Sequence, residues 1–124
     1  MASVMIVGGT EETRLLLRGL LRLYRHRVVG EGPTFAALSS APDPQTSPTV
    51  ALVDIDLDDA DAVHSIAKAR QSYPGIRVLL LTPTRTPAVE ARAKQAGIDA
   101  LIRRPFAVHE LMEALGAAGD TRQP

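Results

Sequence analysis

The chain has 124 residues, a length that suits one compact domain, and 45% of them are hydrophobic, enough to build a substantial core. The formal net charge is zero, which argues against a nucleic-acid-binding domain, since such a domain needs a basic face, and the absence of cysteine excludes disulfides and thiolate metal sites. No apolar run is long enough to cross a bilayer and the first residues lack a signal-peptide pattern, so we expect a soluble, cytoplasmic protein.

In the first half of the chain, short apolar runs alternate with amphipathic segments. The pattern predicts, in order, a strand at 4–7, a helix at 11–24, a weaker strand at 27–30, a short helix at 34–41, a stiff proline-containing loop at 42–48 and a strand at 50–53. The first helix begins with Glu11 and Glu12, whose charges suit the positive end of the helix dipole. Its predicted apolar stripe consists of Leu16, Leu17, Leu20, Leu21 and Leu23.

In the second half of the chain, apolar runs and amphipathic segments continue to alternate. This pattern predicts a helix at 60–73, a strand at 78–81, a helix at 87–96, a strand at 100–102 and a helix at 107–118. Pro87 suits the first turn of its helix, and Gly97 ends that helix. The side chains expected to face the core are Val63, Ile66 and Ala67, then Val108, Leu111, Met112 and Leu115. We expect residues 1–118 to form one domain and residues 119–124 a flexible tail or the start of a linker.

The order of these elements predicts an α/β fold. Strands that alternate with helices form a parallel sheet with helices on both faces, because the crossover connections are right-handed. For five strands and five helices we expect the flavodoxin-like, doubly wound order 2-1-3-4-5, in which the first and third strands are neighbours at the switch point. Ligand chemistry in such folds lies at the carboxyl ends of the strands, where this chain has Gly8, Gly9, Asp54, Thr82, Arg103 and Arg104.

Asp54 is the most informative of these residues. It follows a buried apolar run, and a carboxylate there can bind a metal, accept a phosphoryl group or act as a base. The carboxylates that follow, at Asp56, Asp58, Asp59 and Asp61, lack the glycine and terminal glutamate of a calcium loop. We therefore interpret them as a solvated loop that caps the next helix.

Two other motifs point to weaker hypotheses. Gly8-Gly9-Thr10 can form a phosphate-binding turn of a small nucleotide or flavin protein, but no aromatic residue lies near the strand ends to stack on a base or flavin. The histidines at 26, 64 and 109 lie in different segments without ligand spacing, and we expect them at the surface.

Several segments, in their order and spacing, carry a resemblance to a known family. They are MIVGGTEETR, RVVGEG, VALVDIDLDDAD, VLLLTP, AGIDALIRRPF and VHELMEAL. Over about residues 3–118 the chain resembles the receiver domain of bacterial two-component response regulators. The resemblance implies that Asp54 stands at the position that accepts a phosphoryl group from a histidine kinase, and that Thr82 stands at the position that hydrogen-bonds the phosphoryl oxygens.

The resemblance also exposes departures from the family pattern. Gly8 and Gly9 stand in place of the two acidic residues that hold Mg²⁺, which leaves Asp54 and the backbone carbonyl of Asp56 as the implied ligands. Arg104, before Pro105, replaces the lysine that pairs with the phosphate and can instead pair directly with Asp54. Leu101 occupies the position of the aromatic switch residue.

We therefore expect an atypical receiver, not an enzyme and without catalytic residues or a required cofactor, that serves as a signalling or protein-interaction module independent of phosphorylation. The alternative is a working receiver with a weak Mg²⁺ site, phosphorylated on Asp54 by a histidine kinase and belonging to a transcriptional regulator. The expected partner is another protein or a second copy, bound through the face of the fourth helix, fifth strand and fifth helix. We expect no membrane contact and no direct binding of nucleic acid.

Overall fold

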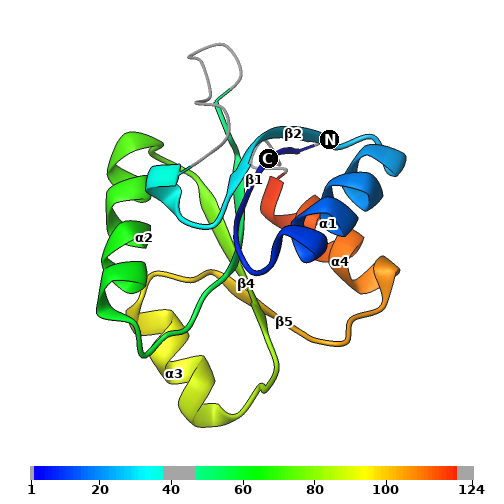
Figure 1. Ribbon diagram of the computed structural model, residues 1–124. Helices are drawn as coiled ribbons and strands as arrows, with labels where there is room; N and C mark the ends of the chain where they lie inside the picture. The colour runs from blue at the N-terminus through cyan, green and yellow to red at the C-terminus, as the bar shows by residue number, and fades with distance from the viewer. Residues whose placement is uncertain (1, 38–46, 120–124) are drawn as a thin grey trace.

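Five parallel strands form one sheet in the structure, a computed structural model that describes residues 2–37 and 47–119. The strands are β1 (Ser3–Gly8), β2 (Arg27–Gly32), β3 (Val50–Asp54), β4 (Arg77–Thr82) and β5 (Ala100–Arg103). Their order is β2-β1-β3-β4-β5, and every neighbouring pair is parallel (Figure 1). The predicted flavodoxin-like fold is confirmed.

The helices cover both faces of this sheet. They are α1 (Glu11–Leu23), α2 (Ala60–Ser72), α3 (Pro87–Gln95) and α4 (Val108–Gly119). In Figure 1, α1 and α4 lie together on one face of the sheet, and α2 and α3 lie on the other. No helix within residues 2–37 and 47–119 combines the length and hydropathy needed to cross a membrane.

The expectation of five helices requires a correction. The described part of the chain has four α-helices, and the helix predicted at 34–41 is represented there only by a 3₁₀ turn, η1 (Phe35–Ala37). Thr34 explains this turn, because its backbone carbonyl and its side-chain hydroxyl both accept the N–H of Ala37, three residues later. Residues 38–41 of the predicted helix and residues 42–46 of the predicted loop lie outside the described residues.

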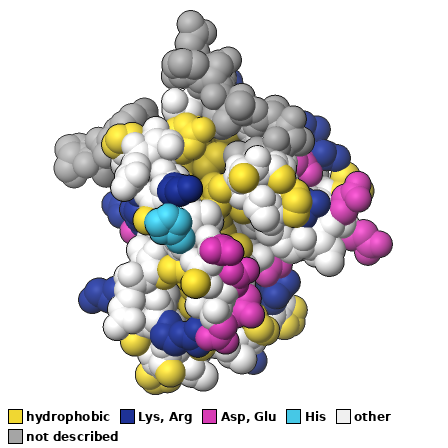
Figure 2. Space-filling view, turned by 60° about the vertical axis from the view of Figure 1, so that its left-hand side comes forward, with side chains coloured by type: hydrophobic (Ala, Val, Ile, Leu, Met, Phe, Trp, Pro, Cys, Tyr) yellow, Lys and Arg dark blue, Asp and Glu magenta, His cyan; other side chains and the backbone are white. Residues whose placement is uncertain are grey.

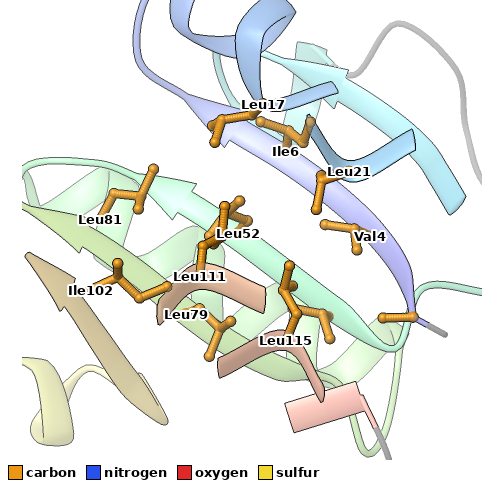
Figure 3. Close-up of a cluster of buried hydrophobic side chains, with 12 residues drawn as sticks. Val4, Ile6, Leu17, Leu21, Leu52, Leu79, Leu81, Ile102, Leu111 and Leu115 are labelled. Atoms are coloured by element: carbon orange, nitrogen blue, oxygen red, sulfur yellow. The ribbon is translucent and has the colours of Figure 1, made fainter. Parts of the chain in front are cut away.

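Two aliphatic layers hold the sheet and the helices together. One layer lies between the sheet and the helices α1 and α4, and Figure 3 shows its side chains pointing toward one another from both sides. Its largest members include Ile6, Leu17, Leu52, Leu79 and Leu111. The other layer packs α2 and α3 against the opposite face. Burial on both faces explains why the strands are almost purely apolar.

The apolar stripe of α1 is narrower than predicted. Leu17 and Leu21 are buried, but Leu16 is 60% exposed and Leu23 is 74% exposed. A helix on a sheet buries a stripe that repeats every three to four residues, and Leu16 projects about 100° around the axis from Leu17. Ala67 on α2 is likewise exposed, while Ala69 is buried in its place.

His26, which follows α1, makes the stability of the fold depend on pH. Its Nδ1 accepts the backbone N–H of Ala2 at 3.0 Å, and burial of the ring, together with the positive N-terminus, lowers the pKa of His26. A lowered pKa means that the unfolded chain takes up this proton more readily than the folded chain. The free energy of unfolding should therefore fall as the pH drops below about 6.5.

Urea unfolding at pH 7.5 and pH 5.5 measures this effect. The variant His26→Asn keeps an acceptor near the same position but does not titrate, so its loss of stability between the two pH values should be smaller than that of the parent chain. Equal losses in the two proteins would contradict the assignment to His26.

Candidate functional site

The carboxyl ends of the strands bring most of the predicted site residues to one edge of the sheet. Gly8 lies opposite Asp54 in the register of β1 with β3, and Thr82 lies opposite Arg103 in the register of β4 with β5. The backbone N–H of Arg104 donates to the carbonyl of Thr82 at 2.8 Å, which extends the pairing of β4 with the chain one residue beyond β5. The result is a cluster around the side chain of Asp54.

Asp54 and Arg104 form an ion pair at the centre of this cluster. Arg104 Nη1 donates to Asp54 Oδ2 at 2.9 Å, and the side chain of Asp54 is 17% exposed while that of Arg104 is 36% exposed. The contact uses one guanidinium nitrogen rather than the two-pronged geometry that arginine often adopts with a carboxylate. Arg104 Nε is buried and finds no hydrogen-bond acceptor among the residues that the structure describes.

The Gly8–Gly9 turn lies directly against Asp54. Both glycines have positive φ, +89° and +69°, and Gly9 donates its backbone N–H to the carbonyl of Asp54 at 3.1 Å. A Cβ atom on Gly8 would lie 2.2 Å from the Asp54 carbonyl oxygen, and one on Gly9 would lie 2.9 Å from Asp54 Oδ2. Asp54 therefore occupies the space that side chains at positions 8 and 9 would need.

Arg14 is a part of this site that the sequence analysis missed. Its Nη1 donates to the carbonyl of Gly9 at 2.8 Å and to that of Gly8 at 3.2 Å. Side chains on a helix point back toward its N-terminus, so an arginine in the first turns of α1 can reach the loop that precedes the helix. That position, five residues after Gly9, was the only available signal.

The residues present do not fit the Mg²⁺ site that the family implies. One oxygen of Asp54 accepts from Arg104, and the two carbonyls of the glycine turn accept from Arg14. The backbone carbonyl of Asp56, the other implied ligand, accepts the N–H of Asp59 at 3.0 Å. Among the described residues, no three acidic or histidine side chains are grouped to hold a metal ion.

The side chains of Thr82 and Leu101 each contact their own neighbours in the fold. Thr82 is buried, and its hydroxyl donates to the carbonyl of Thr84 at 2.8 Å and accepts the Thr84 N–H at 3.3 Å, which closes a local turn. Thr82 nevertheless lines the same cavity, of about 380 Å³, as Asp54 and Arg104. Leu101 is half-buried on β5 and packs against the core layer beneath α2 and α3.

The acidic loop after β3 forms the other wall of the site. Asp59 caps α2 by accepting the N–H groups of Asp61 and Ala62, as expected, and Asp58 pairs with Arg92 of α3. Figure 2 shows acidic side chains gathered on this side of the molecule with basic side chains around them. The loop thus ties β3 to α2 and α3.

The fold is thus a doubly wound parallel sheet whose central strand ends at Asp54, with Thr82 at the end of β4 and Arg104 just after β5. The family model described as response regulator receiver domain matches residues 4–116 of the chain. The chain therefore belongs to the receiver domain family of response regulators, whose members signal through contacts with other proteins such as kinases and effector domains.

Comparisons with individual proteins agree with this family. The response regulator protein VraR of Staphylococcus aureus (strain NCTC 8325 / PS 47) is 30% identical over 88 residues, which are 71% of this chain and 42% of that protein. The chain thus matches less than half the length of this relative.

Solved structures show the same fold. A putative pilus assembly protein from Burkholderia thailandensis superposes with a TM-score of 0.76 at 18% identity, covering 95% of this chain and 98% of that one. A CheY-like receiver domain protein from Methanospirillum hungatei gives a TM-score of 0.74 at 20% identity, with coverage of 97% and 94%. At these identities the likeness concerns the fold alone.

Proposed function

We propose that this receiver domain is an atypical one that serves as a protein-interaction module in signalling without phosphorylation of Asp54. The observation that carries the proposal is the Asp54–Arg104 ion pair beside the Gly8–Gly9 turn. The proposed function requires no cofactor and no catalytic residue of this chain.

The chemistry of phosphoryl transfer supports this proposal. Such transfer depends on positioning and on neutralising the charge of the phosphoryl oxygens, which in most receivers falls largely to a bound metal. Here two glycines replace the acidic ligands, and the arginine at position 104 already neutralises the acceptor carboxylate. A carboxylate in such an ion pair is a weaker nucleophile than a free one, because the guanidinium of Arg104 stabilises its negative charge through Oδ2.

One observation favours the second candidate, a receiver that still accepts a phosphoryl group on Asp54. Arg104 Nε is a buried donor without a partner among the described residues, and an oxygen of a phosphoryl group on Asp54 would supply an acceptor. Thr82 lines the same cavity and offers a hydroxyl. In this case the protein would act downstream of a histidine kinase.

Incubation with acetyl phosphate and MgCl₂ separates the two candidates. Because the metal ligands are missing, we expect no phosphorylated species by intact-mass spectrometry and no Mg²⁺-dependent shift in melting temperature. Asp54→Asn is the matched control, since it removes the acceptor oxygen with little change in shape. A phosphorylated species that appears with the parent chain and not with Asp54→Asn would overturn the proposal.

The partner surface that we propose lies on α3, β5 and α4, the fourth helix, fifth strand and fifth helix of the sequence analysis. Residues of α3, of β5 and of the loops on either side of α3, with Arg70 of α2, line an open cavity there of about 510 Å³. Its rim has mixed charge, with Lys94 and an Arg85–Glu90 ion pair, and Arg85 also donates to the carbonyl of Leu101. Mixed charge beside a half-buried leucine suits a protein partner better than nucleic acid.

A further inference from the structure

Helix α1 presents a second apolar face, which points away from the core. Leu15 is 56% exposed, Leu16 is 60% exposed and Leu23 is 74% exposed, and Tyr24 at the helix C-cap is 50% exposed. These four are all of the large hydrophobic side chains that are exposed in the described part of the chain. Their concentration on one helix marks a surface that gains from being covered.

The spacing of residues on α1 shows that this surface is continuous. Positions separated by three and four residues share one side of a helix, which places on one side Glu12, Leu15, Leu16, Gly19, Arg22 and Leu23. We call these six residues the outer face of α1. Leu17 and Leu21, which are buried against the sheet, lie on the other side of the helix.

Gly19 lies at the middle of the outer face, and no contact within the chain requires a glycine at this position. A Cβ atom on it would meet nothing within 4 Å. Glycine inside a helix lowers helix stability relative to alanine, and none of its neighbours in the fold requires it here. A small residue at the centre of an exposed helix face allows a second helix to approach closely.

The charges on α1 indicate which kind of helix would fit. The first turn carries Glu11 and Glu12, and the last turn carries Arg22, followed by Arg25 after the C-cap. A second copy of α1 running antiparallel would bring the acidic end of each helix to the basic end of the other. The two helix dipoles would also run antiparallel, which is the favourable arrangement.

We propose that the outer face of α1 binds the same face of a second copy of this chain, antiparallel, about a two-fold axis near Gly19. In this arrangement Leu15 lies opposite Leu23 of the second copy, because their positions are symmetric about residue 19. Such an interface is self-complementary, as two-fold symmetry requires. One helix face buries less area than a standard interface, so we expect a weak dimer with a Kd on the order of 10 µM.

The proposal does not rest on the proposed function, because it depends neither on Asp54 nor on the α3–β5–α4 surface. Its first test is a cross-link. The chain contains no cysteine, so Gly19→Cys introduces a single thiol at the proposed two-fold axis, and its Cβ meets nothing within its own chain. Under mild oxidation at protein concentrations near the Kd, Gly19→Cys should form a disulfide-linked dimer.

The matched control for the cross-link is Ala67→Cys, an exposed position on α2, which should remain largely monomeric under the same conditions. Equal cross-linking of the two variants would show random collision rather than a defined interface. It would overturn the proposal, as would a parent chain that stays monomeric at all concentrations in sedimentation equilibrium.

Charge exchange tests the antiparallel arrangement. Sedimentation equilibrium should show that Glu12→Arg and Arg22→Glu each raise the Kd of the dimer at least tenfold, and that the double variant restores much of the affinity. Leu23→Glu should abolish the dimer. Glu90→Arg on α3 is the control and should leave the dimer unchanged. Loss of the dimer in Glu90→Arg, with no effect of Leu23→Glu, would place the interface on α3 and refute the proposal.

Discussion

Gly8→Asp, which returns an acidic residue to one of the two replaced positions, should destabilise the fold by about 3 kcal/mol and should not create a Mg²⁺ site. An aspartate Cβ at this position would lie 2.2 Å from the carbonyl oxygen of Asp54, which is backbone and cannot rotate away. The φ of +89° adds strain for any residue with a Cβ. Left-handed backbone costs about 1 to 2 kcal/mol and overpacking about 1 to 3 kcal/mol.

Urea unfolding of three glycine variants measures this effect against matched controls. Gly9→Asp should cost less than Gly8→Asp, because its Cβ would meet the side-chain oxygen of Asp54, which can shift. Gly19→Ala should instead stabilise the protein by up to about 1 kcal/mol, since its Cβ meets nothing in the chain. Gly8→Asp with parental stability and calorimetric Mg²⁺ binding would disprove the account of the turn.

Breaking the ion pair of Asp54 should have the second large effect. Arg104→Met removes the guanidinium and leaves the carboxylate of Asp54, which is only 17% exposed, without its cation. Removing one partner of a fully buried pair costs about 3 to 5 kcal/mol. Because Arg104 is 36% exposed, solvent screening reduces the expected loss to about 1 to 2 kcal/mol.

A double-mutant cycle isolates the interaction from the other consequences of each change. In Arg104→Met/Asp54→Asn the unpaired charge is absent, so the double variant should be more stable than the sum of the single changes predicts, by roughly 1 kcal/mol. Arg104→Lys keeps the charge and should lose less than Arg104→Met. Strictly additive losses, measured by urea unfolding at constant pH, would mean that the pair contributes nothing to stability.

The fold was predictable because its determinants are local and repetitive. Unbroken apolar runs such as residues 78–81 require strands covered on both faces, and their alternation with helices leaves few topologies. The prediction failed where the local pattern permits two outcomes. The leucines of α1 occupy more than one side of the helix, and only the position of the sheet selects Leu17 and Leu21 for the core.

The sequence indicated which residues lie together at the candidate site, but only some of the contacts between their side chains. Strand order alone indicates that Gly8, Asp54 and Thr82 end at the same edge of the sheet, and the pairing of Arg104 with Asp54 was one of the options that the sequence left open. The contact of Arg14 with the glycine turn was missed, because an arginine on an amphipathic helix has the same pattern whether it faces water or folds back on a loop.

What the sequence by itself determined is the order of the elements, the aliphatic core and the presence of glycine at positions 8 and 9, because these follow from residue type and spacing. What only the tertiary structure decided is which atoms meet. The lack of space for a side chain at Gly8, the engagement of Asp54 by Arg104 and the free space around Gly19 depend on segments far apart in the chain. Distances between such segments arise from the packing of the whole domain, which no local pattern contains.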